Sequence, residues 1–194
     1  MDRGDSAPFH RDEILAPRGW ALLNYLLDAR TGLGRFREFR ISSLQLMNQL
    51  PDLLRRHAVD EILETPDVQD RVALYREHEP WHKEQRLRVG KVHGNLVVFD
   101  LRGEETIHAG NRFVVYALFP DQSLSVRAVW GRQKQNVAFA VGKSILARTS
   151  KTSVGALCLE YGGGGHEEAG SCRGAPEDAN RVLGEPIARS TRDG

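Results

Sequence analysis

The sequence has little cysteine and no excess of charge of either sign, and these two scarcities exclude several classes of protein. Its 194 residues include only Cys158 and Cys172, too few for a disulfide framework and too few on their own for a zinc site. Lys and Arg number 27 against 26 Asp and Glu, so no global basic field favours wrapping a long nucleic acid. Any anion site must be local, and we expect two reduced cysteines in a cytoplasmic protein.

Long apolar runs are also missing. No run approaches the roughly eighteen apolar residues of a membrane span, and the N-terminus lacks the basic segment followed by an apolar one that a signal peptide needs. A chain with 40% apolar and 27% charged residues is typical of a soluble globular protein. We therefore expect one domain, or one domain and part of another, with no membrane partner.

Hydrophobic periodicity predicts a helical first half. A helix is expected over 19–29, and two helical segments over 42–64 and 66–88 resemble a charged connector. The first of these helices should place four apolar residues on one face, namely Trp20, Leu23, Leu26 and Leu27. Ser42 or Ser43 can cap the second segment and Pro66 suits the first turn of the third, while Pro51 and Pro80 predict breaks or kinks.

The pattern changes after residue 89 and predicts an α/β fold. Buried or alternating strands are expected over 95–101, 123–131 and 136–144, and residues 112–119 are ambiguous between helix and strand. Helices are expected over 154–162 and 176–188, with an edge strand over 169–173 between them. Strands that alternate with helices imply an α/β sandwich of about a hundred residues.

Three short motifs suggest chemistry, and each has a plainer interpretation. HEPWH, residues 78–82, has the zinc-protease spacing, but Pro80 would distort the turn and the segment belongs to the charged connector. Gly142-Lys143-Ser144 resembles the end of a P-loop, yet Val137 stands where that loop needs glycine. Arginines are interleaved with phenylalanines over 35–40, which suits phosphates and bases, but short stretches of this kind are more often a half-buried edge or a connector.

The stretch EYGGGGHEEAGSC, residues 160–172, carries the strongest functional signal. Four successive glycines are costly to order, so they form either a slack linker or a backbone that something approaches closely. Their position between an expected helix and an expected strand favours a site. Exposed N–H groups of Gly163, Gly164 and Gly165 could cradle an anion, and His166 could donate to it. Lys143 and Ser144, at the end of a predicted strand, are also well placed for a phosphate, although Lys143 could equally be a solvated surface lysine.

These residues together resemble the C-terminal portion of the DHH phosphoesterase superfamily, most closely its exopolyphosphatase-like branch. The run Gly163-Gly164-Gly165-His166, followed by Ala169-Gly170, is similar to the hallmark of the DHH-associated domain. Lys143-Ser144 is similar to a basic residue and serine that such domains place at a strand end. Near the N-terminus, Asp5-Ser6-Ala7-Pro8-Phe9 fits the last aspartate motif of the catalytic domain.

The resemblance implies a mixed sheet flanked by helices and a division of the chain into three parts. These are the end of a DHH catalytic domain (1–41), a helical connector (42–88) and a substrate-binding DHH-associated domain (89–190). In this view Gly163 to Gly165, His166, Lys143 and Ser144 bind the substrate's phosphate, and Asp5 is a metal ligand for Mn²⁺.

The remaining motifs of the superfamily, including the Asp-His-His triplet, do not occur in the sequence. Two metal ions need several carboxylates and histidines, so no complete catalytic set is expected in this chain. We therefore expect the substrate-binding part of a manganese-dependent phosphoesterase, either as a fragment or as a truncated product. Its partner would be a phosphate-containing small molecule or a short single-stranded nucleic acid, and a homodimer is a further expectation. A non-catalytic nucleotide- or RNA-binding module is the alternative.

Overall fold

A computed structural model describes residues 10–190, with side chains through residue 184, and these residues fall into two units. The first contains the described residues up to Gln85 together with His108–Val114. The second contains Arg86–Ile107 and the residues from Val115 onward. None of the described helices is long and apolar enough to cross a lipid bilayer.

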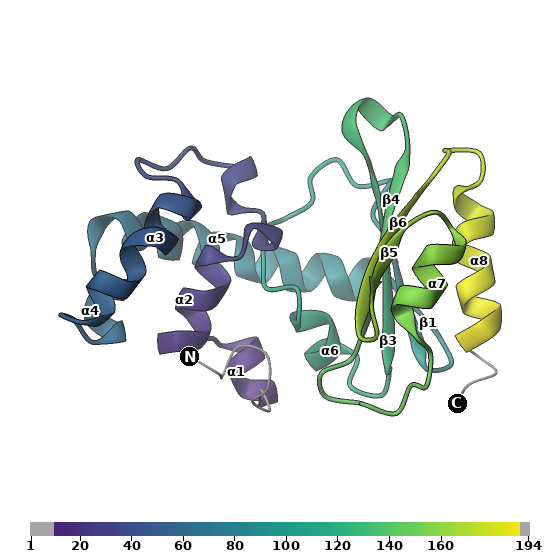
Figure 1. Ribbon diagram of the computed structural model, residues 1–194, viewed down its shortest axis with the longest axis horizontal. Coiled ribbons are helices and arrows are strands. Elements are labelled where there is room, and N and C mark those ends of the chain that lie inside the picture. Colours follow the sequence, from purple (N-terminus) through teal and green to yellow (C-terminus); the bar gives the residue numbers. More distant parts are fainter. Residues whose placement is uncertain (1–9, 191–194) are drawn as a thin grey trace. The chain divides into compact units, whose positions relative to one another are not determined.

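The first unit is helical (Figure 1). In chain order it contains α1 (Arg11–Leu15), α2 (Gly19–Leu27), the short 3-10 turns η1 (Ala29–Thr31) and η2 (Leu33–Arg35), α3 (Ser43–Leu54), α4 (Val59–Leu63) and most of α5 (Pro66–Val89). Three of the four residues expected on the inner face of α2 are buried, namely Leu23, Leu26 and Leu27. The fourth, Trp20, is 54% exposed, so its expected place in the apolar face was wrong.

The predicted helix starts are confirmed, and the break expected near Pro51 comes just after it, between the end of α3 at Leu54 and the start of α4 at Val59, whereas α5 has no break at Pro80. Ser42 caps α3 through a reciprocal pair of bonds with Gln45, and Pro66 is the first residue of α5. Pro51 and Pro80 nevertheless lie inside α3 and α5, which run through them. A proline removes one backbone hydrogen bond and crowds the preceding turn. Buried residues offset that cost here, namely Leu46 and Leu50 before Pro51 in α3, and His78 and His82 on the two sides of Pro80 in α5.

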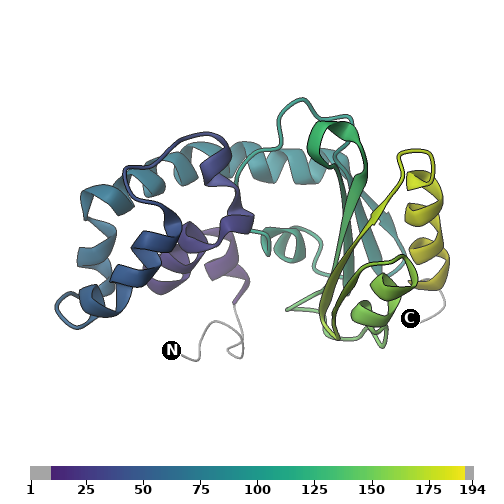
Figure 2. The same ribbon diagram turned by 45° about the horizontal axis from the view of Figure 1, so that its top comes forward.

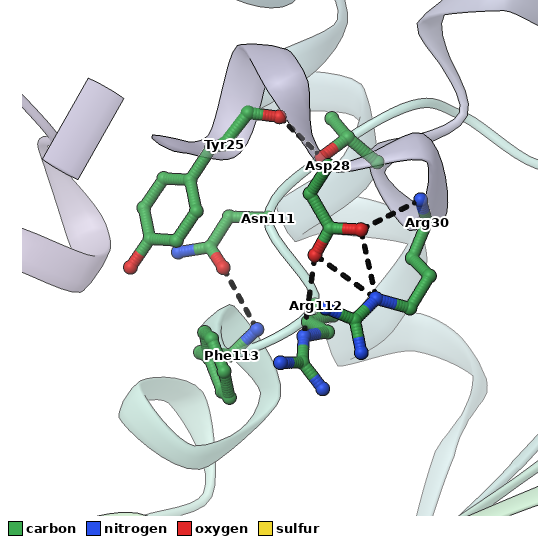
Figure 3. A network of polar contacts seen from close by, with 7 residues as sticks. Tyr25, Asp28, Arg30, Asn111, Arg112 and Phe113 are labelled. Carbon is green, nitrogen blue, oxygen red and sulfur yellow. Dashed lines mark hydrogen bonds and ion pairs between the residues drawn. The ribbon is translucent and has the colours of Figure 1, made fainter. Parts of the chain in front are cut away.

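A polar network ties the segment His108–Val114 to the end of α2 (Figure 3). The Asp28 carboxylate accepts from the backbone N–H and Nε of Arg30, at 2.9 and 2.7 Å, and lies 3.5 Å from Nε of Arg112. Burial opposes ionisation of Asp28, but the hydrogen bonds from Arg30 outweigh it and lower the pKa of the carboxyl group. Nearby, the Asn111 side chain accepts from the N–H of Phe113 at 2.8 Å and so fixes this turn.

The alternating Arg/Phe stretch is part of this helical unit and acts as a connector. Arg40 forms a two-point ion pair with Asp67 at the start of α5, and the Phe39 ring lies 4.2 Å from the guanidinium carbon of Arg71. Arg71 is fully buried and donates to two backbone carbonyls, those of Asp67 and Ile41. These contacts hold the connector in place and leave Phe36 half exposed.

The second unit contains a six-stranded sheet of order β1-β2-β3-β4-β6-β5. The strands are β1 (Gly90–His93), β2 (Leu96–Asp100), β3 (Leu124–Trp130), β4 (Val137–Lys143), β5 (Gly164–His166) and β6 (Ala169–Gly174). Only β2 and β3 pair in parallel, so the sheet is mixed and the predicted α/β fold class is confirmed. The ambiguous segment 112–119 contains a short helix, α6 (Val114–Leu118), and a 3-10 turn, η3 (Arg132–Lys134), joins β3 to β4.

Two helices, α7 (Val154–Glu160) and α8 (Ala179–Ser190), cover the same face of this sheet (Figures 1 and 2). The strands present alternate residues to them, including Val126 and Phe139, and these pack with Leu157 of α7 and Val182 of α8. The expected edge strand over 169–173 is instead internal: β6 lies between β4 and β5. The glycine run itself supplies the edge strand β5, which the sequence did not suggest because glycine weakens strands.

Candidate phosphate-binding site

Strand register brings the predicted phosphate-binding residues together at one end of the second unit's sheet. Gly142 of β4 pairs with Ala169 of β6, and Ala169 pairs in turn with His166 of β5. The next residue of β4, Lys143, donates its backbone N–H to the carbonyl of Glu168 at 2.8 Å. Two segments that are about twenty residues apart in sequence therefore form one local site.

Lys143 is an ion-paired residue rather than a solvated surface lysine. Its Nζ lies 2.9 Å from Oε1 of Glu167 and 3.6 Å from Oε1 of Glu168, and its side chain is only 9% exposed. The hydrogen bond to Glu167 raises the pKa of Lys143, and the same bond lowers the pKa of the Glu167 carboxyl group. Glu167 and Glu168 thus belong to the site, although no sequence motif assigned them a role. Their position directly after the GGGGH run was the available signal.

Ser144 supports the turn that follows β4. It is 2% exposed, and its Oγ accepts from the backbone N–H groups of Leu146 and Ala147 at 3.2 and 2.9 Å. Its own N–H donates to the carbonyl of Ser123 at 2.8 Å. Ser144 is thus committed to local structure through its N–H and its oxygen lone pairs, and only its hydroxyl proton remains available to donate.

His166 is the exposed member of the site. Its Nδ1 accepts the backbone N–H of Glu168 at 3.2 Å across the tight turn between β5 and β6. In the neutral ring this bond assigns the proton to Nε2. The imidazole therefore has one nitrogen that shapes the turn and one that can donate to a ligand.

The three predicted anion-cradling glycines have different surroundings. A Cβ on Gly163 would lie 2.1 Å from the carbonyl oxygen of Ser171, and one on Gly165 would lie 2.3 Å from that of Ala169. A Cβ on Gly164 would meet nothing within 4 Å. None of the three has a positive φ. Close backbone packing therefore accounts for Gly163 and Gly165, and the N–H of Gly163 already donates to the carbonyl of Cys158 at 2.9 Å. Gly164 has open space beside it but is paired with Ser171 in the sheet.

The structure does not test the predicted metal ligand, because Asp5 lies outside the described residues. It does describe the zinc-protease motif. Among residues 10–184, no group of three or more His, Cys, Asp or Glu side chains could hold a metal ion. Glu79, which would be the base of a zinc protease, instead lies 2.9 Å from Nη1 of Arg76 and 3.2 Å from Nζ of Lys83. The described residues therefore fit neither a zinc-protease site nor the manganese pair that the resemblance implies.

A cavity that the sequence did not indicate lies at the far end of β6. Its volume is about 400 Å³, and Tyr161, Arg173 and Arg181 are among its lining residues. Asp178 also lines it and lies 3.4 Å from Nη2 of Arg181. Since β6 runs from Ala169 to Gly174, this cavity and the Lys143 site are at opposite ends of the same strand.

One solved structure resembles this chain closely. It is a pGpG-specific phosphodiesterase, PggH, from Vibrio cholerae, with 56% sequence identity and a TM-score of 0.88. The match covers 97% of this chain and 64% of that enzyme, so this chain spans less than two thirds of the enzyme's length.

An exopolyphosphatase-related protein from Bacteroides fragilis matches at 16% identity, over 75% of this chain and 43% of that one. Its TM-score is 0.47. No family model and no curated protein matches the chain. The similarity to PggH supports a relationship to DHH-type phosphoesterases, and it does not by itself assign the DHH-associated domain.

Proposed function

We propose that this chain is the substrate-binding part of a DHH-type nucleotide phosphodiesterase and that its ligand is a short guanine nucleotide such as pGpG. The observation that carries the proposal is the 56% identity with a pGpG-specific phosphodiesterase over 97% of this chain. The site's chemistry agrees with it, because Lys143 and His166 supply a cation and a hydrogen-bond donor within one local structure. The predicted assignment of residues 89–190 to a DHH-associated domain belongs to the same proposal.

In this proposal a ligand phosphate takes the place of carboxylates on Lys143. Lys143 carries one positive charge against the two negative charges of Glu167 and Glu168. A phosphate can therefore bind only if it displaces at least the shorter contact, that with Glu167. His166 adds a donor through Nε2, and the space beside the Cα of Gly164 is open to a ligand. Ser144 contributes its hydroxyl proton.

The chain is expected to bind the nucleotide without hydrolysing it. Metal ions would activate a water for attack on the phosphate ester, but the described residues offer no set of ligands for them. Asp5, in the proposal, would be one such ligand, and the others would have to come from outside the described residues. The predicted Mn²⁺ requirement and the predicted homodimer remain proposals.

Calorimetric titration of pGpG into the purified chain tests the site. Lys143→Met and His166→Ala each remove one contact to a charged phosphate, so each should weaken binding by roughly 10- to 150-fold. Lys151→Met and His93→Gln are the matched controls, because Lys151 is exposed and His93 lies on β1 at the opposite edge of the sheet. Glu167→Gln should tighten binding, since it removes the competing charge.

Three results would count against the proposal. Wild-type affinity in both Lys143→Met and His166→Ala would show that the phosphate binds elsewhere. Efficient pGpG hydrolysis by the pure chain with Mn²⁺ would show that its catalytic set is complete. Failure of wild type to bind pGpG would refute the proposed ligand.

A further inference from the structure

Four aromatic rings from three separate segments gather in the helical unit around His78. The Phe36 ring lies 4.1 Å from the His78 ring, between centroids, and the Trp81 and His108 rings lie 5.6 and 5.5 Å from it. Trp81 and His108 are also 5.5 Å apart. Phe36 follows η2, and His78 and Trp81 lie one turn apart on α5. His108 is the first residue of the segment His108–Val114, part of which Figure 3 shows near the end of α2. The HEPWH motif therefore contributes to an aromatic cluster.

The rings differ in burial: His78 is a buried support, and two of the rings packed on it are exposed. His78 is only 6% exposed, and its Nδ1 accepts the backbone N–H of Ala109 at 3.3 Å. Trp81 and Phe36, by contrast, are 45% and 37% exposed. A buried, hydrogen-bonded histidine thus fixes two large rings that remain open to solvent. Single exposed aromatic residues are ordinary, but two that pack against one buried ring bring their exposed π faces near each other.

The size of this surface matches one flat ligand better than a protein partner. An aromatic side chain offers about 150–250 Å² in all, so the exposed parts of Trp81 and Phe36 amount to roughly 150–200 Å². A stable interface between two protein copies needs about 800 Å² on each side. A single stacked base suits the smaller area, because every base presents a π face to aromatic rings.

The charge beside the surface favours a purine, and guanine in particular. The guanidinium carbon of Arg35 lies 5.7 Å from the centroid of the Phe36 ring. Arginine donates to acceptor pairs in one plane, and guanine presents O6 and N7 as such a pair. His108, partly exposed at the margin of the cluster, adds a ring that can stack or form a hydrogen bond.

We propose that Phe36, Trp81 and His108, seated on the buried His78, form a stacking surface that binds a purine base. The choice of a guanine nucleotide as ligand rests on the proposed function, whereas the surface itself rests on the ring geometry. This surface belongs to the helical unit, and the Lys143 site belongs to the sheet unit. The two assignments can therefore be tested separately.

The test titrates the full chain with GMP and, separately, with ribose 5-phosphate, which has the sugar phosphate but no base. Removal of the stacking partner in Trp81→Ala should weaken GMP binding by roughly 5- to 150-fold. Trp81→Phe keeps an aromatic face and should retain most of the affinity. Trp20→Phe is the matched control, because Trp20 is similarly exposed, at 54%, but lies outside the cluster. Ribose 5-phosphate should bind all four proteins equally.

Three outcomes would overturn the inference: equal GMP affinity in wild type and Trp81→Ala, an equal loss in Trp20→Phe, or no preference of wild type for GMP over ribose 5-phosphate. If Trp81→Ala does not fold, as judged by circular dichroism, Trp81→Phe and Phe36→Leu carry the comparison, and the loss must then follow aromatic character. His166→Ala separates this inference from the proposed function. His166→Ala should weaken the binding of ribose 5-phosphate. Trp81→Ala should still weaken GMP binding when it is combined with His166→Ala, and the absence of that further loss would count against a separate base surface.

Discussion

A methyl group added at Gly163 should destabilise the sheet unit far more than one added at its neighbour Gly164. A Cβ at position 163 would lie 2.1 Å from the carbonyl oxygen of Ser171 and 2.6 Å from atoms of Cys172, and two of these three nearest atoms belong to the backbone. Backbone atoms inside a paired strand cannot move aside cheaply, so the strand itself must shift. Overpacking of this kind typically costs about 1–3 kcal/mol.

Gly164→Ala is the matched control because it makes the same chemical change with nothing within 4 Å of the new methyl group. Neither residue has a positive φ, so backbone strain does not distinguish them. Alanine at a compatible position stabilises by about 0.4–1 kcal/mol through the unfolded chain. This unfolded-state effect is common to both variants and cancels in the comparison, so Gly163→Ala should be less stable than Gly164→Ala by roughly 1–3 kcal/mol. Urea unfolding followed by circular dichroism measures the difference, and equal midpoints and slopes in the two variants would refute the packing argument.

Two further predictions concern the same part of the sheet. Lys143→Met should raise the pKa of the Glu167 carboxyl group toward its ordinary value of 4.5, because the hydrogen bond from Lys143 is the main cause that lowers it. The pKa of Glu167 is lower in the folded state than in the unfolded chain, so the Lys143–Glu167 contact stabilises the fold above about pH 4.5. This stabilisation is lost as the pH falls through the folded-state pKa. An NMR titration of Glu167 that is unchanged by Lys143→Met would contradict the prediction. Cys158 and Cys172 are both buried, and the contact between them together with burial raises the pKa of the Cys158 thiol. A thiol reagent should therefore react slowly with the native protein and quickly with the denatured protein. Rapid labelling of both thiols in native protein would show that the packing of α7 against β6 does not bury them.

The parts of the fold with a strong local signal were predictable from the sequence. The apolar run over 95–101 became β2, and the start of α3 followed from Ser42 and Gln45, since both signals lie within a few residues. Pro80 was misleading, because local sequence reports the lost hydrogen bond but not the burial that keeps α5 continuous. The glycine run was misleading because it indicated no strand. Its strand β5 exists because β6 and α7 pack against it, and such long-range contacts leave no periodic pattern in four glycines.

The same distinction applies to the candidate site. Lys143 and His166 could be proposed from their motifs, whereas the ion pair between Lys143 and Glu167 depends on the register of β4 with β6. Register is set by side chains along whole strands and is invisible in a short motif. The aromatic cluster depends in the same way on Phe36, His78 and His108, which lie 30 or more positions apart in the sequence.

The ion pair also changes how the GGGGHEE stretch could bind a phosphate. A phosphate-binding lysine is expected to present an uncompensated charge, but here two carboxylates from the adjacent turn contact Lys143. Electrostatic attraction alone would therefore not draw a phosphate to this site, since the nearest three charges sum to minus one. Binding must instead exchange one anion for another on the same cation, with His166 as the additional donor. In the proposed function, an exchange of this kind favours ligands that make further contacts over free phosphate.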